Sequence, residues 1–124
     1  MTLPLATSTW DDEEYAAIQR VIDSDRFSMG PEVEAFEKQF AEFFGAKYAL
    51  MSNSGSSATL LAVAGMIYSK GIDLNPGDEV LVPAVSWSTT YFPVSQYGLS
   101  MRFVDIDVET LNIDINAIED AITE

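Results

Sequence analysis

The chain has 124 residues, of which 48% are hydrophobic, and its six basic and twenty acidic residues give a formal net charge of −14. The absence of cysteine and histidine excludes disulfides, thiol nucleophiles, catalytic triads built on histidine and the usual zinc sites. The negative charge argues against nucleic acid or an anionic membrane as a partner.

The length suits one domain at most, and the hydrophobic content is sufficient for a core, so we expect a globular and soluble protein. No apolar run approaches the roughly 20 residues that a membrane-spanning helix needs. The N-terminus also lacks the basic and apolar regions of a signal peptide, which leads us to expect a cytoplasmic location.

Residues 1–9 are expected to form an extended arm, and two helices are predicted after it. Apolar residues repeat at helical spacing from about Asp11 to Ser24. A second helix is predicted over Pro31–Phe44, because proline suits the first helical position and Gly45 suits the position after the last. Phenylalanines along one side of this helix indicate a packing face.

The loop between these helices carries an aromatic residue and a methionine at its centre, in the run Phe27-Ser28-Met29. Two interpretations stay open. These side chains form an interaction surface or lid, or they pack back on the core.

A strand is expected over Tyr48–Met51, followed by the polar turn Ser52–Ser57 and a helix. A helix that opens on small hydroxyl residues leaves its first N–H groups free and can hold an anion, most plausibly a phosphate. Gly55 would permit close approach. The alternative, favoured by this stretch alone, is that Ser54 is an ordinary N-cap with Ser56 and Ser57 in the first turn. The Walker A and dinucleotide fingerprints are absent.

The second half of the chain predicts a strand over Glu79–Pro83 and a loop over Ala84–Phe92, rich in hydroxyls and aromatics. Such a loop follows the carboxyl end of a strand, where ligands bind in open α/β sheets. A helical segment to about Tyr97, a strand over Met101–Val104 and a last helix follow. The last helix places three isoleucines on one face: Ile115, Ile118 and Ile122.

Strands that alternate with helices predict an α/β fold with a mainly parallel sheet covered by helices. Three parallel strands would leave a sheet edge and much of both faces uncovered. We therefore expect an incomplete domain, or one that assembles with another copy.

Several ordered motifs resemble the DegT/DnrJ/EryC1/StrS family of pyridoxal-phosphate-dependent sugar aminotransferases and dehydratases across essentially the whole chain. Within it, Ser86–Pro93 and the opening Pro4-Leu5-Ala6 are most similar to the branch that removes a sugar hydroxyl. The other matching segments are Met29-Gly30-Pro31, Phe36-Glu37, Ser54-Gly55-Ser56, Pro76-Gly77-Asp78-Glu79-Val80 with Pro83, Phe103-Val104-Asp105-Ile106-Asp107 and Asn112-Ile113-Asp114.

The resemblance implies that residues 1–124 are the N-terminal part of the large domain of a type I aminotransferase-like fold. It implies pyridoxal 5'-phosphate or pyridoxamine 5'-phosphate as cofactor, with Gly55 and Ser56 at its phosphate and Trp87 stacked on its ring. Without the resemblance, a core tryptophan would be the preferred interpretation of Trp87. The segment of Phe27, Ser28 and Met29 would be a substrate or dimer loop, and no metal site is implied.

The substrate implied is a nucleotide-linked 4-keto-6-deoxy sugar, and the assembly implied is a homodimer. In the family, the aspartate that bonds the pyridine nitrogen and the catalytic lysine, or the histidine that replaces it in 3-dehydratases, match positions beyond Glu124. The chain alone is therefore expected to be inactive. Two alternatives are a nucleotide-sugar aminotransferase and a non-catalytic α/β module that oligomerises through its unfinished sheet.

Overall fold

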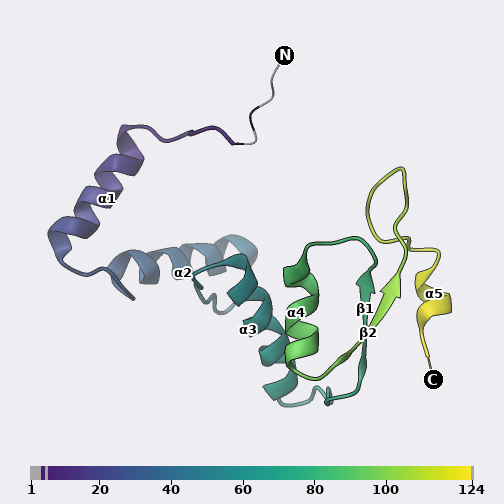
Figure 1. Ribbon diagram of the computed structural model, residues 1–124. Helices are drawn as coiled ribbons and strands as arrows, with labels where there is room; N and C mark the ends of the chain where they lie inside the picture. Colours follow the sequence, from purple (N-terminus) through teal and green to yellow (C-terminus); the bar gives the residue numbers. More distant parts are fainter. Residues whose placement is uncertain (1–3, 5, 124) are drawn as a thin grey trace. The chain divides into compact units, whose positions relative to one another are not determined.

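The computed structural model describes residue 4 and residues 6–123 (Figure 1). The chain divides into two compact units, Met1–Met51 and Ser52–Glu124. The described elements are α1 (Asp12–Ser24), α2 (Pro31–Phe44), α3 (Gly55–Tyr68), β1 (Glu79–Pro83), α4 (Ser88–Gln96), β2 (Ser100–Val104) and α5 (Ile118–Ala121). Of the arm expected over residues 1–9, residues 1–3 and 5 lie outside the described part, and the others form neither helix nor strand.

The first helix, α1, confirms the prediction of a helix from about Asp11 to Ser24. Its start is a capping box, in which Asp11 Oδ1 accepts from the Glu13 N–H at 2.8 Å and Glu14 Oε2 accepts from the Asp11 N–H at 2.7 Å. Its end is set by Asp25, which adopts the left-handed conformation with a φ of 53°. Local polar groups thus determine both ends of α1.

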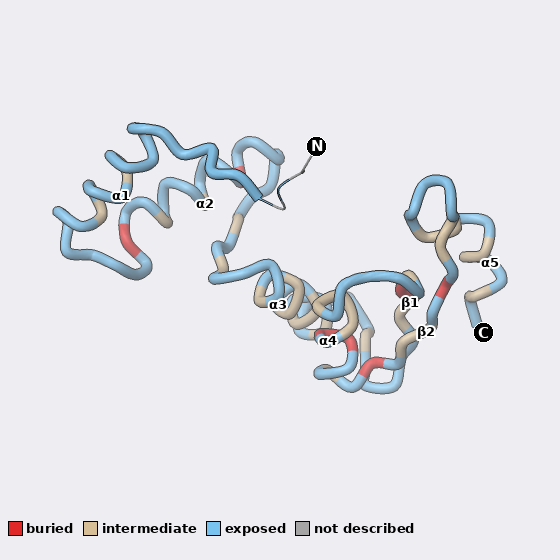
Figure 2. The backbone as a smooth tube through the Cα atoms, turned by 45° about the horizontal axis from the view of Figure 1, so that its top comes forward, coloured by how far each residue is buried: buried red, intermediate tan, exposed pale blue. Residues whose placement is uncertain are grey.

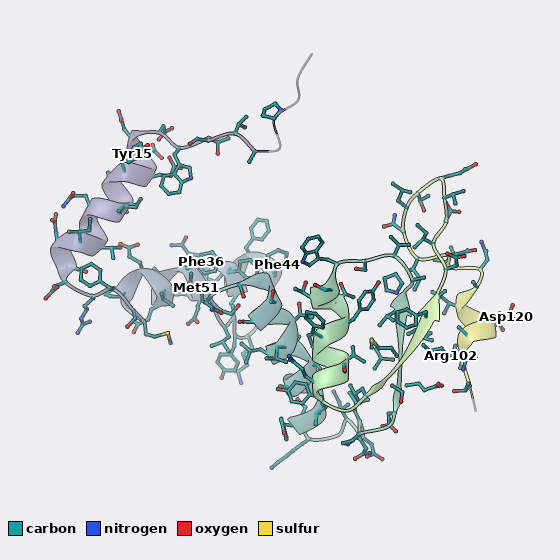
Figure 3. All side chains as sticks on the ribbon, in the orientation of Figure 1. Tyr15, Phe36, Phe44, Met51, Arg102 and Asp120 are labelled. Carbon is teal, nitrogen blue, oxygen red and sulfur yellow. The ribbon has the colours of Figure 1, made fainter. Side chains whose placement is uncertain are left out.

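The second helix, α2, also has the predicted bounds, with Pro31 at its start and Gly45 after its end at a φ of 65°. Its phenylalanine face contacts itself: the ring centroids of Phe36 and Phe40 are 5.5 Å apart, and those of Phe40 and Phe44 are 4.6 Å apart. Figure 3 shows Phe36 and Phe44 on this helix. All of these rings remain largely exposed within the first unit, so the packing face is formed but not covered.

The prediction of a strand over Tyr48–Met51 is wrong. These residues are not in a strand, and none of the described residues pairs with them in a sheet. The Met51 N–H instead donates to Glu37 Oε1 at 2.8 Å, from the neighbouring α2. Apolar, β-compatible residues become a strand only where a second strand accepts their hydrogen bonds.

The second unit contains a parallel pair of strands, β1 and β2, with Glu79 opposite Ser100 and Pro83 opposite Val104. The parallel arrangement is confirmed, although the described sheet has two strands where three were expected. Helix α4 connects the two strands, as a parallel pair requires a crossover.

Helices α3 and α4 lie side by side, and α4 also contacts both strands (Figures 1 and 2). The buried core of this unit consists of Val82, Val94 and Leu99, with Val63 and Ile67 of α3 packed against it. Buried positions are sparse along the tube in Figure 2. The hydrophobic content therefore forms only a small core within the described residues, and many large apolar side chains stay exposed.

The last helix is shorter than predicted, because α5 covers only Ile118–Ala121. Ile115 precedes it in a turn, where Asp114 Oδ1 accepts from the Asn116 N–H at 2.9 Å. An aspartate side chain that bonds the backbone two residues ahead competes with helical hydrogen bonding. Over the residues that the structure describes, no helix has the length and apolar character needed to span a membrane.

Candidate functional site

A shallow groove of about 160 Å³ lies between α3 and α4 in the second unit. The first turns of both helices contribute to it, because it includes Ser56 from α3 and Thr89 from α4. Two helix N-termini therefore border one groove. Its full lining is Ser56, Ser57, Leu60, Thr89, Phe92, Pro93 and Gln96.

Two serines at the start of α3 have different hydrogen bonding. Ser54 is the N-cap, and its Oγ accepts from the Ser57 N–H at 3.2 Å. The hydroxyl of Ser56 has no hydrogen bond to any described residue, and the N–H groups of Gly55 and Ser56 have no acceptor among those residues. The interpretation of Ser54 as a cap is thus confirmed, and the cap leaves Ser56 and two N–H groups available.

Gly55 is not required by the chain's own packing. A Cβ at this position would meet no atom within 4 Å, and Gly55 does not adopt a positive φ. The backbone at the start of α3 is consequently open to close approach by a group from outside the chain.

Trp87 stands at the start of α4 and occupies its N-cap position, with a φ of −75° and a ψ of 148°. An indole has no acceptor for the first N–H groups of a helix, so α4 has no side-chain cap. The side chain is 78% exposed. Among the described residues, Trp87 therefore does not belong to the buried core.

The loop expected over Ala84–Phe92 is shorter than predicted, since α4 begins at Ser88. Serine, threonine and aromatic residues have modest helix propensity, which is why the sequence suggested a loop. Packing overrides that preference, because Tyr91 and Val94 of this helix contact or belong to the buried core.

The groove contains no charged side chain, and its polar side chains are serine and threonine hydroxyls and one amide. An anion placed there would be held by neutral donors and by the positive ends of helix dipoles. Across residue 4 and residues 6–123, no group of three or more aspartates or glutamates could hold a metal ion. The site therefore suits a phosphate more than a cation.

The loop of Phe27, Ser28 and Met29 belongs to the first unit, where it lines a cavity of about 200 Å³ together with residues of α1 and α2. Phe27 is 69% and Met29 is 74% exposed, and Met29 adopts a positive φ of 47°. Within the first unit these two side chains are therefore largely exposed. Gly55, Ser56 and Trp87 lie in the other unit.

Sequence reasoning placed Thr89 and Phe92 in a ligand-binding loop without singling them out, and it did not include Gln96. They are spaced three and four residues apart, so they share one face of a helix. That spacing is a usable signal only once α4 is known to begin at Ser88, because in a loop it has no meaning.

Comparison with known proteins identifies the relatives of this chain. The model of the DegT/DnrJ/EryC1/StrS aminotransferase family matches residues 8–124. The chain is 58% identical to GDP-4-keto-6-deoxy-D-mannose 3-dehydratase of Yersinia pseudotuberculosis, over all of this chain and 32% of that protein. It is 36% identical to UDP-2-acetamido-2-deoxy-3-oxo-D-glucuronate aminotransferase of Pseudomonas aeruginosa, over 90% of this chain and 30% of that protein.

Among solved structures, the chain matches E. coli GDP-4-keto-6-deoxy-D-mannose-3-dehydratase with bound hydrated PLP. The TM-score is 0.92 at 57% identity, covering 99% of this chain and 32% of that one. The α/β, aminotransferase-like fold expected from the sequence is thereby confirmed. The chain spans about a third of the length of the curated relatives it matches.

Proposed function

The chain belongs to the DegT/DnrJ/EryC1/StrS aminotransferase family, and we propose that it forms the cofactor-phosphate site of an enzyme that uses pyridoxal or pyridoxamine phosphate. The substrate class is a nucleotide-linked 4-keto-6-deoxy sugar. The reaction is removal of the C3 hydroxyl, as in the GDP-4-keto-6-deoxymannose 3-dehydratases that share 58% of its residues. Such a step belongs to deoxysugar biosynthesis.

The observation that carries this proposal is the unused donor set at the start of α3. The Ser56 hydroxyl and the N–H groups of Gly55 and Ser56 have no partner among the described residues. Gly55 has no side chain that would block access to these donors. In this proposal these donors hold the cofactor phosphate, with the dipole of α3 adding favourable potential. The groove between α3 and α4 gives the phosphate a second helix N-terminus nearby.

Trp87 has a different role in the proposal. Its exposed indole, at the end of a short loop after β1, stacks on the pyridine ring and holds a flat cofactor without a covalent bond. The bound cofactor supplies an electron sink for proton removal next to the substrate's carbonyl carbon. We assign no catalytic residue to this chain, which spans about a third of the length of these relatives.

The proposal also covers the domain, location and oligomeric state of the protein. The chain forms part of the large domain of an aminotransferase-like enzyme, and the working enzyme is a cytoplasmic homodimer. The exposed loop of Phe27, Ser28 and Met29 supports a role at a dimer or substrate surface. The charge of −14 supports the absence of a nucleic-acid partner.

A nucleotide-sugar aminotransferase is the second candidate, favoured by the 36% identity to an aminotransferase of that class. Both candidates use the same cofactor-phosphate site, so the residues described here do not separate them. The non-catalytic module predicts instead that the start of α3 binds no cofactor.

Equilibrium dialysis with pyridoxamine phosphate tests the proposal, because this amine does not form imines with surface lysines as pyridoxal phosphate does. We expect saturable binding that weakens about tenfold in Ser56→Ala, the loss of one hydrogen bond to a charged group. Trp87→Ala should weaken binding by about the same factor through lost stacking. Ser95→Ala, an exposed serine of α4 outside the groove, should bind as the parent does.

Far-UV circular dichroism must first show that each variant keeps its helices. A folded parent chain that binds no pyridoxamine phosphate would contradict the proposal for this chain and favour the non-catalytic module. Binding that is equally tight in Ser56→Ala and Ser95→Ala would instead move the phosphate away from the start of α3.

A further inference from the structure

The loop that carries Trp87 is closed by side-chain hydrogen bonds. The Tyr91 hydroxyl donates to the carbonyl oxygen of Pro83 at 2.9 Å, and the hydroxyls of Ser86 and Thr90 are hydrogen-bonded at 2.8 Å. These two bonds connect the first turns of α4 to the end of β1 and to the residue before Trp87. The loop between β1 and α4 is therefore held at both of its sides.

The end of β1 is itself well anchored. The Ala84 N–H donates to the carbonyl oxygen of Val104 at 2.7 Å, which continues the pairing of β1 with β2 by one residue. Movement of the loop relative to the sheet is thus restricted from its first residue.

The ring of Tyr91 provides a fixed base for its hydroxyl. It packs against the core of Val82, Val94 and Leu99, and it meets the ring of Phe103 edge to face with 5.7 Å between centroids. A half-buried ring between a sheet and a helix has little rotational freedom. Its hydroxyl, which donates to Pro83, therefore links the loop to the core.

We propose that Tyr91, with the Ser86–Thr90 pair, is a positioning residue that holds Trp87 in the orientation needed for stacking. Trp87 has no side-chain cap bond of its own and is exposed, so its direction is set by the backbone on either side. The two bonds flank this backbone. The role of Trp87 in stacking rests on the proposed function, whereas the restraint on its motion does not.

Holding the indole in place before binding lowers the entropy that the cofactor must remove. Immobilising one side chain on binding costs about 0.5–1.5 kcal/mol, which converts to about a two- to tenfold change in affinity. A phenylalanine at position 91 keeps the ring in the core but cannot donate to Pro83. We therefore expect Tyr91→Phe to weaken pyridoxamine phosphate binding by about that factor.

The direct test is time-resolved fluorescence anisotropy of Trp87 in a Trp10→Phe background, where Trp87 is the sole tryptophan. Tyr91→Phe and Ser86→Ala should each increase the amplitude of fast depolarisation. Tyr97→Phe is the matched control, because this tyrosine also packs against the core at the other end of α4 and its hydroxyl bonds no described residue. It should leave the Trp87 decay unchanged.

Unchanged depolarisation in a folded Tyr91→Phe chain would overturn the proposal, as would an equal increase in Tyr97→Phe, which would indicate general loosening of the core. If Tyr91→Phe does not fold, the exposed Ser86→Ala variant decides, since it leaves the core intact. Increased depolarisation in Tyr91→Phe together with no cofactor binding by the parent would uphold the restraint and refute the proposed function.

Discussion

Ser54 offers a substitution whose structural and ligand effects can be separated. Its Oγ caps α3 by accepting from the Ser57 N–H at 3.2 Å, and α3 contributes Val63 and Ile67 to the core packing of the second unit. Replacing an N-cap serine by alanine costs about 1 kcal/mol of stability, within a range of about 0.5–2. We expect Ser54→Ala to lower the ratio of folded to unfolded chain about fivefold.

Urea unfolding followed by far-UV circular dichroism measures this effect. With a urea dependence of about 1–2 kcal/mol per molar, the midpoint should fall by about 0.5–1 M. Ser56→Ala should change the free energy of unfolding by less than about 0.5 kcal/mol, because its hydroxyl bonds no described residue. Stability and phosphate binding are thus assigned to two serines that are two positions apart.

The charge at position 54 separates the cap from the anion site. Asparagine and aspartate cap a helix about as well as serine, so Ser54→Asn and Ser54→Asp should both keep the stability of the parent. Only the aspartate adds a negative charge beside the proposed phosphate, and only Ser54→Asp should weaken pyridoxamine phosphate binding, more so at low salt. Equal affinity in the Asn and Asp variants would refute an anion site at the start of α3, and an equal loss of stability in Ser54→Ala and Ser56→Ala would refute the division of roles.

Further substitutions test the backbone and a turn. Gly45→Ala should destabilise the first unit by about 1–2 kcal/mol, since Gly45 has a φ of 65°. Gly65→Ala inside α3 should stabilise the second unit by about 0.5–1 kcal/mol. Urea titration measures both changes, and stabilisation by Gly45→Ala would contradict the left-handed end of α2. The N–H groups of Thr110 and Glu109 lower the pKa of Asp107. A lowered pKa stabilises the folded turn above the usual aspartate range, and this contribution is lost as pH falls through the folded pKa. Carboxyl carbon NMR titration should show the low pKa, Asp107→Asn should remove the acid-dependent change in the turn, and an unshifted titration would refute the assignment.

The first two helices were predictable from local signals: α1 from apolar residues that repeat at helical spacing, and α2 from Pro31 and Gly45 at its ends. The groups that set their ends act within one helical turn: the Asp11–Glu14 capping box of α1, Pro31 at the first position of α2 and Gly45 after its last residue. Such groups have the same effect whatever the rest of the chain does. The bounds of α1 and α2 were accordingly correct within one residue.

The elements that were predicted wrongly depend on partners distant in the sequence. Tyr48–Met51 has strand-like residues but no strand to pair with among the described residues, and its last N–H bonds Glu37 instead. Conversely, Ser88–Phe92 has weak helix formers but becomes the start of α4, because Tyr91 and Val94 pack on β1 and β2 residues. Local propensity is a fraction of a kcal/mol per residue, so packing reverses it readily.

For the site, the sequence alone determined which residue types could hold a phosphate, and the family resemblance selected Gly55, Ser56 and Trp87 as positions. The sequence did not determine whether the Ser56 hydroxyl was already hydrogen-bonded or whether Trp87 was buried. The stretch itself favoured Ser54 as a cap, and the structure confirms this. Only the tertiary structure decided that the Ser56 hydroxyl bonds no described residue and that Ser56 and Thr89 border one groove. The physical reason is that a cap is formed within one turn, whereas a groove exists only where two helices from separate parts of the chain pack together.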